Sequence, residues 1–170
     1  MPKAIILYVR YVDGFNKRVG RMAMYLIFAM IGVLLYSSIS RTVFDVPLIW
    51  VVEMAQFGMA AYYLLGGGYS MQLDTHVRMD LLYSKWSPRG QAIADSITVV
   101  FLIAYLLLLL YGAISSTQYA IEYGQKNYSS WAPPVAPIKI IMTLGIFMML
   151  LQTISMFFKD LARIKGMVIK

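Results

Sequence analysis

The chain has 170 residues, of which 60% are hydrophobic and 14% are charged, and its mean hydropathy is +0.67. This composition excludes an ordinary soluble domain and predicts an all-α integral membrane protein. The net charge of +7 follows the pattern of membrane topology, so we expect no nucleic-acid partner. Because the chain has no cysteine, disulfides and thiolate metal sites are also excluded.

The first element is a short apolar run, residues 4–9, which is too short to span a membrane. No small-residue cleavage site follows it, so we do not expect a cleaved signal peptide. Over the next turns, basic residues alternate with aromatic ones, namely Arg10 and Lys17 with Tyr11 and Phe15. This pattern predicts an interfacial amphipathic helix at the N-terminus.

Four longer apolar segments follow, and each is long enough to cross a bilayer, which requires about 20 apolar residues. They comprise residues 19–40, 46–73, 92–115 and 134–158. Only short polar connections separate them, and no stretch resembles a linker or a second domain. We therefore predict a single membrane domain, residues 1–170, with four transmembrane helices.

The basic residues predict the orientation, because cytoplasmic loops carry an excess of Lys and Arg. Most of them lie before the first span, between the second and third spans, and in the C-terminal tail. The opposite side has only Arg41, Lys126 and Lys139. Four spans with this distribution place both termini in the cytoplasm.

A charged cluster ends the second span and contains Asp74, His76, Arg78 and Asp80. One interpretation is a juxtamembrane cap, in which residues four apart pair on a helix surface. The alternative is a metal site, although a single His with two carboxylates is a poor set of zinc ligands. The sequence by itself leaves both interpretations open.

The connection between the second and third spans is predicted to contain a second interfacial amphipathic helix. Its apolar residues, which include Trp86, are interspersed with Arg78 and Lys85. Ser87 and Pro88 then provide an N-cap and a proline at the first helical position. A new helix is therefore predicted to begin there.

The stretch HVRMDLLYSKWSPRGQAIAD, residues 76–95, resembles the H-V-R-V-D stretch of the small membrane subunit of tripartite ATP-independent periplasmic (TRAP) transporters, the DctQ-like family. Arg41 followed by Phe44 resembles the arginine and aromatic that end the first span of that family. The resemblance covers residues 22–165, nearly the whole chain.

Three further motifs resemble the same family in the same order. Trp50 and Glu53 are similar to its W-x-E-E signature, but Val52 stands at the position of the first glutamate. The stretches SSWAPPVAPIK, residues 129–139, and LLQTIS, residues 150–155, resemble the end of the longer members.

The resemblance implies a non-catalytic small subunit of a sodium-driven, binding-protein-dependent transporter in the bacterial cytoplasmic (inner) membrane. Such a subunit packs as a scaffold against the large membrane subunit, which moves an organic anion delivered by a periplasmic substrate-binding protein. Sodium is then expected in the large subunit, and no cofactor is expected in this chain. Membrane lipids, including a bound phospholipid, are further expected partners.

Polar residues inside the predicted spans are few, whereas a solitary transporter needs them near the middle of the membrane. Glu53 lies in the outer part of the second span, and Lys139 lies at a comparable depth in the fourth. We expect Glu53 to form a structural pair with Lys139 or with Arg41. A coupling-ion site at Glu53 is the alternative.

The remaining predictions concern packing and partner contacts. Gly67, in a run of three glycines, is expected to pack against a neighbouring helix, and the tryptophans are expected at the membrane interfaces. Trp131 is either a surface anchor or a contact for a partner. The predicted structural and partner-contact residues are Arg41, Trp50, Glu53, Gly67, His76, Arg78, Asp80, Trp86, Trp131 and Lys139.

Two other classes of function fit the same spans. One is a small homodimeric transporter that uses Glu53 as its coupling carboxylate. The other is the membrane anchor of a redox enzyme with a quinone site. A haem held by two histidines of this chain is excluded, because His76 is its only histidine.

Overall fold

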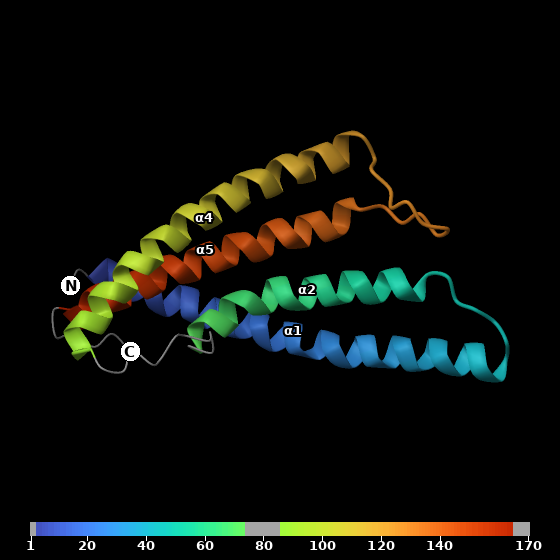
Figure 1. The fold of residues 1–170 in the computed structure, drawn as a ribbon, viewed down its shortest axis with the longest axis horizontal. Helices are drawn as coiled ribbons and strands as arrows, with labels where there is room; N and C mark the ends of the chain where they lie inside the picture. Colours follow the sequence, from blue (N-terminus) through green and yellow to red (C-terminus); the bar gives the residue numbers. More distant parts are fainter. Residues whose placement is uncertain (1–2, 74–85, 165–170) are drawn as a thin grey trace.

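The computed structural model describes residues 3–73 and 86–164. These residues form four helices, which are α1 (Lys3–Val43), α2 (Val51–Gln72), α4 (Pro88–Glu122) and α5 (Ala136–Ile164). The helices lie lengthwise side by side (Figure 1). The start of α1 and the end of α5 lie at one end of the bundle, and the α1–α2 and α4–α5 connections lie at the other. The predicted all-α class is therefore confirmed.

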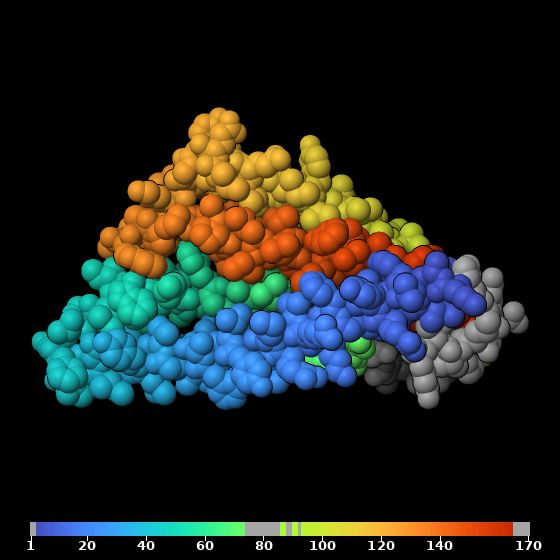
Figure 2. All heavy atoms as spheres, turned by 180° about the vertical axis from the view of Figure 1, so that it is seen from behind, coloured from blue at the N-terminus to red at the C-terminus, as the bar shows by residue number. Residues whose placement is uncertain are grey.

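The bundle consists of two antiparallel hairpins that are joined through α5. Helices α1 and α2 pack along each other, and α4 packs on α5. Helix α5 also contacts both α1 and α2, so it is the helix shared by the two hairpins. Figure 2 shows α5, in orange and red, between α4 and the α1–α2 pair.

Helix α1 is continuous over 41 residues, which corresponds to about 60 Å. The sequence predicts an N-terminal amphipathic helix separate from a span at residues 19–40, but both segments belong to one helix. The interfacial position of the first segment stays a prediction. A buried stripe at helical spacing crosses the expected boundary without a break, and packing against it keeps the segment helical. Its members are Val9, Val12, Asn16, Gly20 and Ala23.

Three of the four described helices are long and apolar enough to cross a membrane: α1, residues Ile93–Glu122 of α4, and α5. Helix α2 has 22 residues, which is a sufficient length, but Glu53, Gln56 and several glycines and tyrosines lower its hydropathy. The membrane class is supported, and the fourth span stays a prediction. The N-cap prediction is confirmed at the start of α4, where the Ser87 Oγ accepts a hydrogen bond from the Gly90 amide at 3.2 Å.

Glycines allow α5 and α2 to approach each other closely. A Cβ atom at Gly145 of α5 would lie 2.8 Å from the carbonyl oxygen of Leu64 in α2. A Cβ atom at Gly67 of α2 would lie 2.5 Å from the sulfur of Met149 in α5. The obstacle at Gly145 is backbone and cannot rotate away, so this position sets the distance between the two helices.

We expect Gly145→Ala to destabilise the bundle by about 1–3 kcal/mol, because the added methyl group overpacks the α2–α5 contact. The matched control is Gly112→Ala in α4, where a Cβ atom would have nothing within 4 Å. That change should be neutral or stabilise the helix by roughly 0.5–1 kcal/mol. Thermal unfolding of the purified chain in detergent measures both, and equal midpoints for the two variants would contradict the packing assignment.

Candidate functional site

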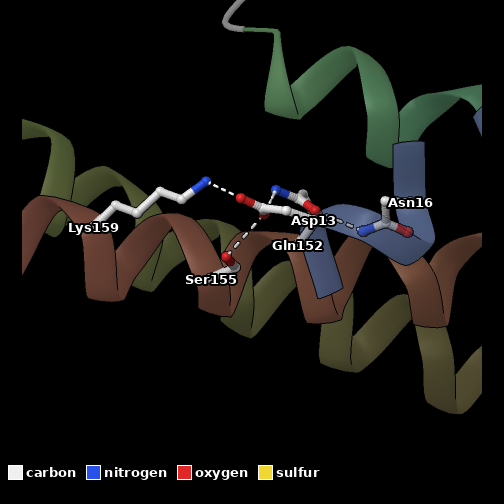
Figure 3. Close-up of polar contacts among 5 residues, drawn as sticks. All are labelled: Asp13, Asn16, Gln152, Ser155 and Lys159. Carbon is white, nitrogen blue, oxygen red and sulfur yellow. Dashed lines mark hydrogen bonds and ion pairs between the residues drawn. The ribbon is translucent and has the colours of Figure 1, made fainter. Parts of the chain in front are cut away.

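A cluster of polar side chains lies where α1 meets α5 (Figure 3). We call it the polar junction, and its members are Asp13, Asn16, Gln152, Ser155 and Lys159. Gln152 and Ser155 are 0% exposed, and Asn16 is 1% exposed. Polar groups buried in this way must find partners within the protein.

Gln152 is the central member of the polar junction. Its Nε2 donates to Asp13 Oδ1 at 2.9 Å, and its Oε1 accepts from Asn16 Nδ2 at 2.6 Å. The Ser155 hydroxyl donates to the same Asp13 Oδ1 at 3.2 Å. The Lys159 ammonium pairs with Asp13 Oδ2 at 2.5 Å. Both carboxylate oxygens are therefore occupied by donors of the same chain, and each of these contacts joins α1 to α5.

Helix α2 reaches the same place. A Cβ atom at Gly68 of α2 would lie 3.3 Å from Asn16 Oδ1, so the asparagine rests directly on this glycine. Asn16 Oδ1 is buried and has no hydrogen-bond partner in the described residues. Thr153 follows Gln152 in α5, and its hydroxyl lies 3.9 Å from the sulfur of Met71 in α2. The polar junction is thus the meeting point of three helices.

Sequence reasoning missed the polar junction. The signal was present as spacing: Asp13 and Asn16 are three apart, and Gln152, Ser155 and Lys159 are three and four apart. Polar residues at such spacings share one face of a helix. A polar face on a membrane helix needs a polar partner. Two such faces in one chain therefore predict that the two helices contact each other there.

A second polar cluster lies near the other end of the bundle, around Lys139 of α5. Its ammonium group donates to Gln125 Oε1 at 2.8 Å and to the Ser116 carbonyl oxygen at 3.3 Å. The hydroxyl groups of Thr117 in α4 and Thr143 in α5 are 2.9 Å apart beside it. This cluster fastens α4 to α5 and to the connection that follows α4.

The expected pairing of Glu53 with Lys139 or Arg41 is wrong. Neither pair forms in the part of the chain that the structure describes. Lys139 is directed instead to α4 and to Gln125. Glu53 is the third residue of α2 and is 6% exposed. Its Oε2 atom is buried without a hydrogen-bond partner among the described residues.

The α4–α5 connection, residues 123–135, folds back on itself. The Asn127 amide donates to the Pro133 carbonyl oxygen, and the Val135 amide donates to the Gln125 carbonyl oxygen, both at 3.0 Å. Because the Gln125 side chain is held by Lys139, the connection is attached to the helices at its base. Its tip exposes the whole side chain of Tyr128.

The other predicted site residues are not brought together. Arg41 is exposed at the end of α1, and Trp50 is the N-cap of α2 without a side-chain hydrogen bond to the helix. Trp86 precedes α4, and Trp131 lies in the 123–135 connection; both are exposed. Gly67 lies against α5, as described above.

The charged cluster at the end of the second predicted span cannot be placed. His76, Arg78 and Asp80 lie outside the described residues. The juxtamembrane cap and the alternative metal site therefore both stay predictions.

Two surface grooves are present in the described part. One, of about 430 Å³, lies between α1 and α2 and includes Tyr62, Tyr63 and Tyr69 in its lining. The other, of about 410 Å³, lies between α4 and α5 and includes Tyr105 and Leu109. Neither groove is lined by a charged side chain.

Comparison with protein families gives one match that covers most of the chain. The model of the DctQ component of tripartite ATP-independent periplasmic transporters matches residues 30–163. The matched range contains all of α2 and α4 and all but the last residue of α5. It therefore includes the members of the polar junction that lie in α5. The comparison with curated proteins gave no match.

We expect Gln152→Met to destabilise the bundle by about 1–3 kcal/mol, because Asn16 and Asp13 each lose a buried hydrogen-bond partner. Gln118→Met is the matched control, since it makes the same chemical change at an exposed position of α4. Thermal unfolding in detergent compares the two. A loss of stability that is equal in both variants would show that the hydrogen bonds of Gln152 add nothing.

We also expect Lys139→Met to loosen the 123–135 connection, because Gln125 loses the ammonium group that holds it. Hydrogen exchange of the amides of residues 125–135, followed by mass spectrometry, should become faster. Lys126→Met is the control, because Lys126 is exposed in the same connection. Unchanged exchange in Lys139→Met would refute the attachment.

Proposed function

Since the chain belongs to the DctQ family, the small component of TRAP transporters, we propose that it is a non-catalytic scaffold for the large membrane subunit. In this role it holds the large subunit in the bilayer and moves no solute itself. The observation that carries this proposal is the contrast between its interior and its surface. Polar groups of the polar junction bond to one another, whereas the surface offers mainly apolar side chains.

The apolar surface of α1 and α4 supports a role in lipid and against a large partner. Phe28 of α1 and Phe101 and Leu108 of α4 are 67%, 73% and 74% exposed. In a membrane these side chains contact acyl chains or the helices of another protein, and neither contact requires polar groups. The two described grooves have uncharged linings, which suits an acyl chain better than an anion.

The finer features of the transport cycle are part of the same proposal. Uptake is sodium-driven, the solute is an organic anion, and sodium binds to the large subunit. Both termini face the cytoplasm of a bacterial cell and the 123–135 connection faces the periplasm. In support of this, the start of α1 and the end of α5 lie at the opposite end of the bundle from that connection (Figure 1). The chain itself holds no cofactor.

Partner contacts are proposed at both ends. Tyr128 and Trp131, exposed on the attached 123–135 connection, contact the large subunit or the periplasmic binding protein. The groove between α1 and α2, with its tyrosine lining, takes the acyl chain of a phospholipid.

The test is purification of the tagged chain from its native membrane in mild detergent. We expect the large subunit to be recovered with it in equal amount, as identified by mass spectrometry. In liposomes, uptake should require both subunits, the binding protein and a sodium gradient.

Recovery of the chain alone as a stable homo-oligomer that transports solute would contradict the scaffold role. Glu53→Gln would then test Glu53 as the coupling carboxylate. A bound quinone in the purified chain would instead favour a redox anchor.

A further inference from the structure

The first half of α1 carries a line of cations on its exposed side. Lys3, Arg10, Lys17 and Arg21 follow one another at intervals of seven, seven and four residues. These spacings place the four residues along one side of the helix. All four are exposed. We call this line the basic ridge.

An exposed apolar stripe runs beside the basic ridge. Leu7, Tyr11, Phe15 and Met22 recur at intervals of four and seven, and 51–79% of each residue is exposed. The stripe lies on the side of α1 that faces away from its buried residues, among them Val9 and Asn16. Figure 2 shows α1, in blue, on the surface of the molecule along its length.

No acidic side chain is paired with the basic ridge in the part of the chain that the structure describes. Asp13 is the only acidic residue among residues 3–24, and its two oxygens are taken by Lys159, Gln152 and Ser155. None of the four ridge cations forms an ion pair in the described ranges 3–73 and 86–164. A ligand of this surface must therefore supply negative charge.

The contacts of Tyr8 place this segment beside the last apolar turns of α5. The Tyr8 hydroxyl donates to the Leu151 carbonyl oxygen at 3.2 Å. The Tyr8 ring packs edge-on against the Phe158 ring, and the two ring centroids are 6.2 Å apart. Lys159 and Arg163 follow directly in α5. The segment thus lies where an apolar helix gives way to charged residues, which is the level of the lipid headgroups.

From these observations we propose that the basic ridge binds the phosphate groups of anionic phospholipids while the apolar stripe inserts at the boundary with the acyl chains. A basic line beside an apolar line is the arrangement of helices that lie in an anionic membrane surface. The site requires only this chain and a bilayer. It therefore stands or falls independently of the proposed scaffold role.

The test uses the full chain reconstituted in bilayers. Because the chain has no cysteine, Tyr11→Cys gives a unique site for a nitroxide label. Collision rates of the label with oxygen and with a water-soluble nickel complex report its depth. In bilayers of phosphatidylcholine with added phosphatidylglycerol, we expect oxygen collisions to exceed nickel collisions. Pure phosphatidylcholine should reverse this order.

Charge removal makes the test specific. In the labelled chain, Lys3→Gln with Arg10→Gln should weaken the association of the helix with anionic lipid about fivefold per charge. Added phosphatidylglycerol should then no longer change the collision rates of the label. The matched control is Arg41→Gln with Lys126→Gln, which removes two exposed cations at the other end of the bundle and should retain the effect.

Two outcomes would overturn the proposal. A label that collides freely with nickel in both kinds of bilayer would show that the segment projects into water. A label that becomes shielded from both reagents only when the large subunit is present would assign the surface to a protein partner with acidic groups.

Discussion

The arrangement of the helices depends on the hydrogen bonds that Gln152 makes from α5 to α1. In a bilayer, apolar helices gain little from contacting one another, because the surrounding acyl chains are equally apolar. Packing and polar contacts must therefore select the neighbours. Gln152 binds Asp13 and Asn16 at once, and Asn16 rests on Gly68 of α2. The polar contact of α5 with α1 and the contact of α1 with α2 thus meet at Asn16.

Glycine and polar side chains complement each other in this bundle. Gly145 brings α5 within backbone contact of α2, and Gly68 makes room for Asn16. Close approach strengthens the buried hydrogen bonds, because water and lipid are excluded from them. The polar contacts in turn keep the helices in the register at which the glycines face their neighbours. The result is a rigid frame whose outer surface is left for lipid and protein partners.

The sequence predicts the helices better than it predicts their partners. Apolar length alone indicates the membrane class, and Ser87 with Pro88 locates the start of α4 correctly. It does not reveal that α1 is unbroken, because the pattern of Arg10 and Tyr11 fits an interfacial helix as well as one face of a longer helix. The decisive stripe, from Val9 to Ala23, is recognisable only once its packing surface is known.

The candidate site shows the same limit. Glu53 and Lys139 are at similar predicted depths, yet depth says nothing about which way each side chain points around its helix. Lys139 meets α4 and Gln125, and Glu53 does not reach it. Asp13 lies before the predicted first span, so sequence reasoning did not consider it as an interior residue. Its importance follows from the antiparallel contact of α1 with α5, which pattern alone does not supply.

The position of α5 has a consequence for how the chain is made. Of the four described helices it comes last in the chain, and it contacts the other three. The α1–α2 hairpin can form while synthesis continues, but α4 has its principal packing partner only when α5 emerges. The described bundle can therefore be completed only after α5 has been synthesised, and a chain that stops before α5 would leave α4 in the membrane without its principal neighbour.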